Sequence, residues 1–176
     1  MLGLGNVLMG DDAFGPWVVH VLSEGWTFPD GVEVVDVGTP GLDLTPFLSG
    51  AATVVIVDTV HADGAPGELK LYGKAALLSS PPKPRVSPHD PGLVEALLLL
   101  DFAGTGPAEV LLVGAIPLST GKGTALTPAL QEAVPRAAEA VLAELARRGL
   151  SATRREGFVP RPPWWEAPPG SVPGEG

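Results

Sequence analysis

Apolar residues along this chain fall into short β-branched stretches and longer segments with the spacing of an amphipathic helix. The clearest strand, Thr53–Asp58, is an almost unbroken β-branched run of the kind that is buried on both faces of a sheet. Further strands are predicted at Met1–Leu4, Val32–Val37, Glu68–Tyr72 and Glu109–Ile116, with Glu68–Tyr72 as an edge strand. Because strands alternate with helices, the pattern predicts an α/β fold: a three-layer α/β/α sandwich around a mostly parallel, twisted sheet of about five strands.

Two longer helices are predicted from apolar spacing and from capping residues. In the first, Ala13–Ser23, one apolar stripe should pack on the sheet, which leaves His20 on the solvent side. The members of this stripe are Phe14, Val18, Val21 and Leu22. The last helix has Thr127 as its N-cap and Pro128 at its first position, and it ends at about Arg148.

Shorter helices are predicted at Leu42–Leu48 and Leu93–Leu100. In the second of these, Val94, Leu97 and Leu98 are expected to form the buried face. Between them, the segment 74–85 is predicted to be irregular because it contains three prolines.

The 176 residues are predicted to form one domain, 1–156, followed by a proline-rich C-terminal tail, 157–176. We expect the tail to be disordered because it cannot build a core, although Trp164 and Trp165 could dock on the domain or on a partner. The first strand, Met1–Leu4, is short for the centre of a sheet, so we expect the native start to lie a few codons upstream or the chain to be truncated.

Charge and composition exclude several classes of function. The formal net charge of −9 disfavours nucleic acid and anionic membranes as partners. No apolar stretch reaches the ~20 residues that span a bilayer, and no basic segment of a signal peptide is visible at the start. Cysteine is absent, which excludes disulfides, thiolate metal sites and a cysteine nucleophile. These features together predict a cytoplasmic protein.

Chemistry is concentrated in the turn after the first strand, where Gly3 and Gly5 precede the acidic pair Asp11 and Asp12. Ligands of open α/β sheets bind at the carboxyl ends of the strands, which places this pair in the binding crevice. A dinucleotide loop is disfavoured because Leu8 stands where the third glycine is needed. Either aspartate could instead cap the helix that follows, which would leave the other for chemistry.

Two later residues are expected to reach the same crevice. Asp58 ends the central strand, and a carboxylate is rarely placed there without a partner because its desolvation is costly. His89 lies in a loop before a helix, between Pro88 and Pro91, whose rings stiffen the backbone around it. Each of these residues has a plainer alternative, because Asp58 could cap a turn and His89 could simply be exposed.

Taken together and in order, the motifs resemble those of the hydrogenase maturation endopeptidases, from Met1 to about Glu156. The motifs are Gly3-x-Gly5-Asn6-x-Leu8-x-x-Asp11-Asp12-x-x-Gly15, Asp36-x-Gly38-Thr39, Val57-Asp58, Ser87-Pro88-His89-x-x-Gly92-Leu93 and Val113-Gly114. The resemblance implies a phosphorylase/hydrolase-like fold and a protease that removes a C-terminal peptide from the precursor of the nickel–iron hydrogenase large subunit. It further implies that Asp12, Asp58 and His89 contact nickel carried by that precursor.

The resemblance also links the turn at Asp36 to cleavage, although family members usually have a residue smaller than Val37 beside it. Nickel would act as a Lewis acid, lower the pKa of an attacking water, or only anchor the substrate. His61 is a further candidate base. No G-x-S-x-G or H-E-x-x-H motif occurs, which disfavours the usual serine and zinc proteases. The alternatives are a small-ligand or anion-binding α/β protein, or an inactive adaptor that binds the large subunit.

Overall fold

The computed structural model describes residues 1–39, 44–79, 92–159 and 161–166. In these residues five strands form one sheet in the order β3-β1-β4-β6-β5. Their bounds are β1 Leu2–Leu4, β3 Val35–Gly38, β4 Thr53–Thr59, β5 Leu69–Gly73 and β6 Glu109–Ala115. All neighbours pair in parallel except β5 and β6, which pair antiparallel. The predicted mostly parallel sheet, with Glu68–Tyr72 at its edge, is therefore confirmed.

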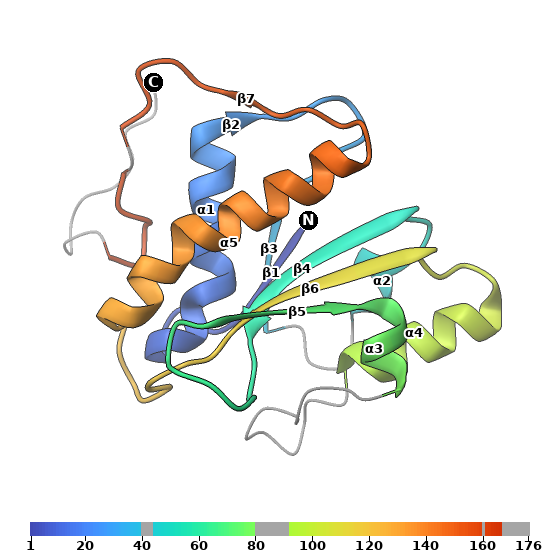
Figure 1. Ribbon diagram of the computed structural model, residues 1–176, viewed down its shortest axis with the longest axis horizontal. Helices are drawn as coiled ribbons and strands as arrows, with labels where there is room; N and C mark the ends of the chain where they lie inside the picture. Colours follow the sequence, from blue (N-terminus) through green and yellow to red (C-terminus); the bar gives the residue numbers. More distant parts are fainter. Residues whose placement is uncertain (40–43, 80–91, 160, 167–176) are drawn as a thin grey trace.

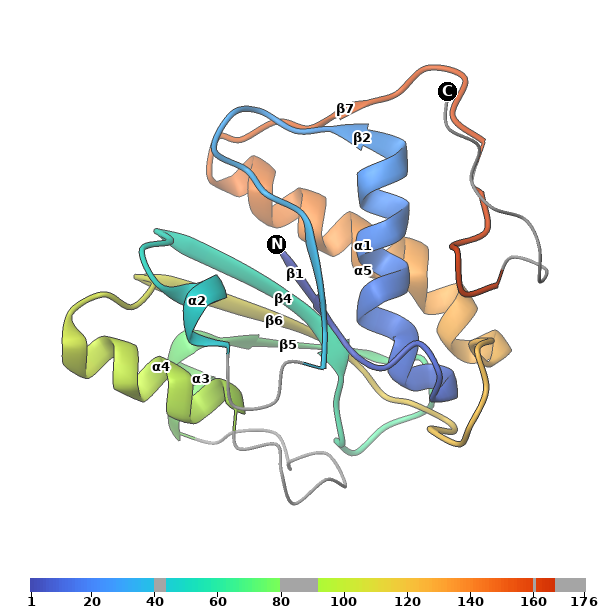
Figure 2. The ribbon, with the colours of Figure 1, turned by 180° about the vertical axis from the view of Figure 1, so that it is seen from behind.

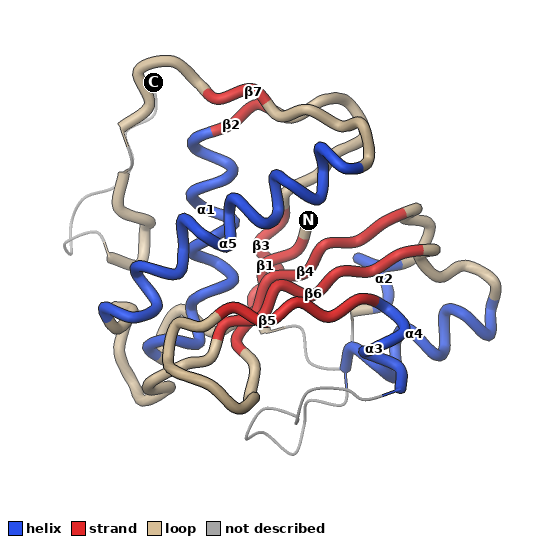
Figure 3. Tube along the Cα trace, in the orientation of Figure 1, coloured by secondary structure: helices blue, strands red, loops and turns tan. Residues whose placement is uncertain are grey.

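Helices cover both faces of the sheet (Figures 1 and 2). One face carries α1 (Phe14–Gly25) and α5 (Pro128–Arg147). The other carries α2 (Thr45–Leu48), α3 (Lys74–Ser79) and α4 (Gly92–Ala103). Figure 3 shows the strands side by side between these two groups, as the predicted α/β/α sandwich requires. None of the helices in the part of the chain that the structure describes could span a bilayer.

Strand β4 is buried on both faces, as its β-branched run predicts. Val55 and Val57 belong to the core under α1 and α5, whereas Val54 and Ile56 belong to the core under the other helices. This division follows from the alternation of side chains along a strand. A polar side chain at any of these four positions would therefore be buried. Polar residues follow them only at the carboxyl end of the strand.

The close approach of α1 to the sheet depends on Gly15. A Cβ at this position would lie 2.2 Å from the carbonyl oxygen of Leu4 and 2.4 Å from that of Val57. Both are backbone atoms that cannot rotate away, so only glycine allows the contact. The three-residue strand β1 is thereby held between β3, β4 and the start of α1, which places the turn after β1 at the carboxyl edge of the sheet.

Two predicted elements differ in the structure. Residues Lys74–Ser79 form α3 and not an irregular segment, because they precede the prolines and are mostly good helix formers; residues 80–85 lie outside the described ones. In α4, Leu98 is 54% exposed, whereas Ala96, Leu97 and Leu100 are buried. The four consecutive leucines of this helix make it apolar on every side, so the spacing does not identify one buried face.

The chain after α5 returns along α1, on the outside of the domain (Figure 1). Strands β2 (Trp26–Thr27) and β7 (Thr153–Arg154) pair antiparallel. Further along, the Trp165 ring meets Trp17 edge to face at 6.0 Å between ring centroids. His20 Nε2 donates to the carbonyl oxygen of Arg161 at 2.8 Å. His20 is therefore half-buried and not solvated as expected, because a segment 141 residues later covers it.

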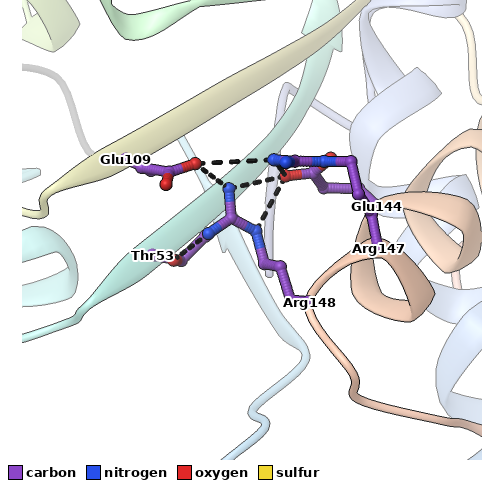
Figure 4. A network of polar contacts seen from close by, with 5 residues as sticks. All are labelled: Thr53, Glu109, Glu144, Arg147 and Arg148. Atoms are coloured by element: carbon purple, nitrogen blue, oxygen red, sulfur yellow. Dashed lines mark hydrogen bonds and ion pairs between the residues drawn. The ribbon is translucent and has the colours of Figure 1, made fainter.

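An ionic network fastens α5 to the amino ends of β4 and β6, as Figure 4 shows. Arg148 donates to Thr53 Oγ1 at 2.7 Å and to Glu144 Oε1 at 2.8 Å, and it pairs with Glu109. Glu144 also accepts a bond from Arg147 Nε at 2.9 Å. The hydrogen bond from Arg147, followed by those of Arg148, lowers the pKa of Glu144 from 4.5 to about 2. These groups stabilise the edge of the sheet opposite the acidic turn.

Candidate active site

The acidic turn begins at Gly5, directly after β1. Gly5 has a φ of +143°, and a Cβ there would lie 1.8 Å from the carbonyl oxygen of Asp12. The turn continues into a 3-10 helix, η1 (Gly10–Ala13), which carries both aspartates into the start of α1. The glycine thus lets the chain fold back so closely that Asp12 lies beside the strand end, which agrees with the predicted sharp turn.

Asp11 is completely buried and joins this turn to the segment before α5. Its Oδ2 accepts from the backbone N–H groups of Leu118 at 2.8 Å and Ser119 at 2.9 Å. Thr127 donates twice, from its N–H to Oδ1 at 2.7 Å and from its hydroxyl to Oδ2 at 3.0 Å. Thr127 occupies the N-cap position of α5, as predicted, but its hydroxyl serves Asp11 and not the helix. Buried carboxylates need such partners, so Asp11 is a structural residue.

Capping by one of the two acids, one of the alternatives for this pair, is not observed. The residues at the N-cap positions of η1 and α1 are Met9 and Ala13, and neither makes a side-chain cap bond. The two aspartates differ in another way. Asp11 turns into the protein toward the loop before α5, whereas the half-buried Asp12 faces the end of β4.

Asp12 and Asp58 both contact Thr59, the last residue of β4. The Asp58 Oδ1 atom accepts from the Thr59 N–H at 2.6 Å, and the Thr59 hydroxyl lies 3.5 Å from Asp12 Oδ1. Asp12 Oδ2 also accepts from the backbone N–H of Asn6 at 2.9 Å. Thr59 is only 4% exposed, whereas both carboxylates are partly accessible. Two carboxylates 46 residues apart in the chain therefore both contact Thr59, at the carboxyl edge of the sheet.

The remaining predicted residues lie as follows. Asp36 is exposed on β3 and accepts from the N–H of Gly38 at 3.0 Å, at the same edge of the sheet. His61 is half-buried in the loop after β4. His89 lies outside the described residues. Within the described parts of the chain, no three histidine or acidic side chains are grouped so that they could hold a metal ion.

Sequence reasoning missed Thr59 and the structural role of Asp11. Thr59 follows Asp58 directly, so a polar pair at the end of an apolar strand was the available signal. For Asp11 no local signal existed, because its partners lie 107 to 116 residues later.

Comparisons with known proteins identify the family of this chain. Residues 16–144 match the model of a family described as hydrogenase maturation protease. The hydrogenase 2 maturation protease of Escherichia coli is 35% identical over 160 residues, which cover 89% of this chain and 95% of that protein. The hydrogenase expression/formation protein HupM of Azotobacter chroococcum is 38% identical over 159 residues, covering 89% and 76%.

Solved structures give the same result. The hydrogenase maturating endopeptidase HybD of E. coli superposes with a TM-score of 0.79 at 35% identity, covering 88% of this chain and 95% of that one. The hydrogenase maturation protease HycI of Thermococcus kodakarensis has a TM-score of 0.61 at 28% identity, covering 83% and 90%. These relatives support a protease and not the alternative of a small-ligand or anion-binding protein. This chain belongs to the hydrogenase maturation protease family.

Proposed function

We propose that this protein is the endopeptidase that removes the C-terminal extension of a nickel-loaded hydrogenase large-subunit precursor, and that Asp12, Asp58 and His89 contact the nickel. The observation that carries this proposal is that Asp12 and Asp58 both contact Thr59 at the carboxyl edge of the sheet, in a chain of the hydrogenase maturation protease family. The position of the third residue comes from its motif alone.

The chemistry of this set suits nickel. Two carboxylates and one imidazole are ligands that a borderline metal accepts without thiolate. The Asn6 N–H holds the Asp12 carboxylate in one orientation, as groups behind a metal ligand commonly do. Three protein ligands leave coordination positions open for groups of the precursor or for water. In this proposal the nickel is carried by the substrate, as the family resemblance implies, and the protease recognises a precursor by whether its metal has been inserted.

Hydrolysis at this edge needs a group that moves a proton to or from water. We assign this role to Asp36, which makes the enzyme a protease of the aspartyl type. It is exposed, carries a carboxylate, and lies on β3 at the same edge as Asp12. Its Oδ1 atom accepts a hydrogen bond from the Gly38 N–H, which holds the carboxylate in one orientation, as positioned proton-transfer groups require. Nickel in the precursor would supply Lewis-acid assistance or a more acidic water at the same place.

The test uses the purified protein and a nickel-loaded precursor, with the released peptide measured by mass spectrometry. Asp12→Asn, Asp58→Asn and His89→Gln should each lower processing by about a hundredfold or more, because even groups that only orient a metal ligand contribute about 10–100-fold. Their thermal midpoints should stay near that of the wild type. Asp30→Asn, at an exposed aspartate before β3, is the matched control and should process normally. Normal trimming by both the Asp58 and His89 variants would refute the site assignment.

Nickel recognition needs a separate comparison. The wild-type protein should cut the nickel-loaded precursor and leave the nickel-free precursor intact. Equal rates on both precursors would show that the protein is a protease that does not recognise the metal.

A further inference from the structure

Two loops at the carboxyl edge of the sheet are joined into one rigid rim beside the acidic pair (Figures 1 and 2). The Gly123 N–H donates to the carbonyl oxygen of Leu8 at 2.9 Å, and the Gly10 N–H donates to that of Gly123 at 2.7 Å. The Asp11 N–H donates to the carbonyl oxygen of Ser119 at 3.0 Å. Main-chain bonds in both directions therefore fix the turn after β1 against the loop after β6.

Each loop presents one exposed leucine on this rim. Leu8 is 59% exposed and Leu118 is 62% exposed. The Leu8 N–H donates to Asn6 Oδ1 at 3.0 Å, and Asn6 in turn holds Asp12 through its own N–H. The Leu118 N–H donates to Asp11 Oδ2 at 2.8 Å. Both leucines are thus linked to the acidic pair, one through Asn6 and the other directly.

We propose that Leu8 and Leu118 form an apolar ledge that binds an apolar segment of the hydrogenase precursor next to the bond that is cut. This inference rests on the proposed function. Single exposed leucines are common on protein surfaces, but these two lie on hydrogen-bonded loops that adjoin the candidate site. A ledge whose backbone is already fixed loses little conformational freedom when a partner covers it, so its apolar area contributes efficiently to binding.

The occupant we propose is a polypeptide segment of the precursor, because main-chain hydrogen bonds join the rim to the turn that carries Asp12, which is proposed to contact the precursor's nickel. It is apolar because the rim offers two aliphatic side chains, and the carboxylates beside them would repel an acidic segment. The exposed leucines of α4 are a different surface, since that helix covers the opposite face of the sheet from α1 (Figure 2). Leu99 of α4 is 61% exposed and therefore provides a control of matched exposure.

The experiment measures processing kinetics of the nickel-loaded precursor by Leu8→Ser, Leu118→Ser and the double variant. Each single change should raise KM about tenfold and the double change about a hundredfold, as for side chains at the centre of an interface. The kcat should stay within about twofold, since no group that contacts the metal is altered. Leu8→Met and Leu118→Met should restore near wild-type KM, and Leu99→Ser should leave it unchanged. Thermal midpoints of all variants report whether the fold is intact.

A double variant with wild-type KM overturns the ledge, and so does a rise in KM caused by Leu99→Ser but by neither ledge variant. Binding to the immobilised precursor separates the ledge from the proposed function. A wild-type protein that binds without cutting, while the double variant fails to bind, refutes the protease and supports the ledge. A wild-type protein that cuts, with a double variant that binds and cuts equally well, refutes the ledge and leaves the protease standing.

Discussion

The sharpest consequence of the structure is that the two adjacent aspartates contribute differently to stability and activity. Asp11 is fully buried and accepts four hydrogen bonds from described residues, three of them at Oδ2. Replacing it by asparagine keeps the volume and removes the charge. The least damaging orientation places the new amide nitrogen at the position of Oδ1, where two donors, this nitrogen and the Thr127 N–H, face each other and one hydrogen bond is lost. The amide oxygen then takes the position of Oδ2 and keeps the other three hydrogen bonds, now to a neutral acceptor.

The magnitude follows from these contacts. One lost bond to a charged acceptor costs about 1.5–3 kcal/mol, and weakening of the other three adds to it. We expect Asp11→Asn to lower the free energy of unfolding by about 2–4 kcal/mol. Asp11→Ala leaves all four donors without this acceptor and should lower the free energy of unfolding by about 3–5 kcal/mol. Removing one partner of a buried ion pair has an effect of the same size. For a chain of this length the asparagine variant then lowers Tm by roughly 4–16 °C.

Urea unfolding followed by far-ultraviolet circular dichroism measures these values. Asp36→Asn is the control, because Asp36 is exposed and an asparagine oxygen can still accept from Gly38, so the change should stay within about 0.5 kcal/mol. Asp12→Asn should abolish processing with a far smaller stability loss than Asp11→Asn. An Asp11→Asn protein within about 0.5 kcal/mol of the wild type would refute the structural assignment of this carboxylate.

Three other changes test the rest of the fold. Gly15→Ala should lower the free energy of unfolding in urea by about 3 kcal/mol or more, because its Cβ would meet two backbone oxygens within 2.4 Å. Gly73→Ala, whose Cβ would have no atom within 4 Å, is the control and should be near neutral. Equal effects of the two changes would contradict the close approach of α1 to the sheet. The pKa of Glu144 is lowered to about 2, so its stabilisation is present above its ordinary value of 4.5 and is lost as pH falls below that value. Glu144→Gln should therefore flatten the loss of urea resistance between about pH 5 and pH 2, and an unchanged pH profile would exclude this contribution. Trp165→Ala should remove about 0.5–1.5 kcal/mol of edge-to-face interaction with Trp17 and speed chymotrypsin cleavage at Phe158. An unchanged cleavage rate would show that this contact does not hold the tail.

Local patterns predicted the strands and the long helices well, because burial on one or both faces imposes a period that the residues of one segment show by themselves. The β-branched run of β4 and the caps of α5 are examples. The pattern failed where it is ambiguous. The leucines of α4 suit every side of a helix, so Leu98 was assigned to the wrong face, and α3 was missed because its short helical segment precedes a run of prolines.

The sequence by itself determined the order of the elements, the family motifs and the position of Asp58 at the end of a buried strand, since each is written within a few neighbouring residues. Only the tertiary structure decided which acid of the pair is structural. Asp11 is satisfied by donors 107 to 116 residues away, and Asp12 meets Thr59 47 residues later. Such partners are set by how the strands and helices pack together. A pattern read along one segment carries no information about a hydrogen bond between two different segments.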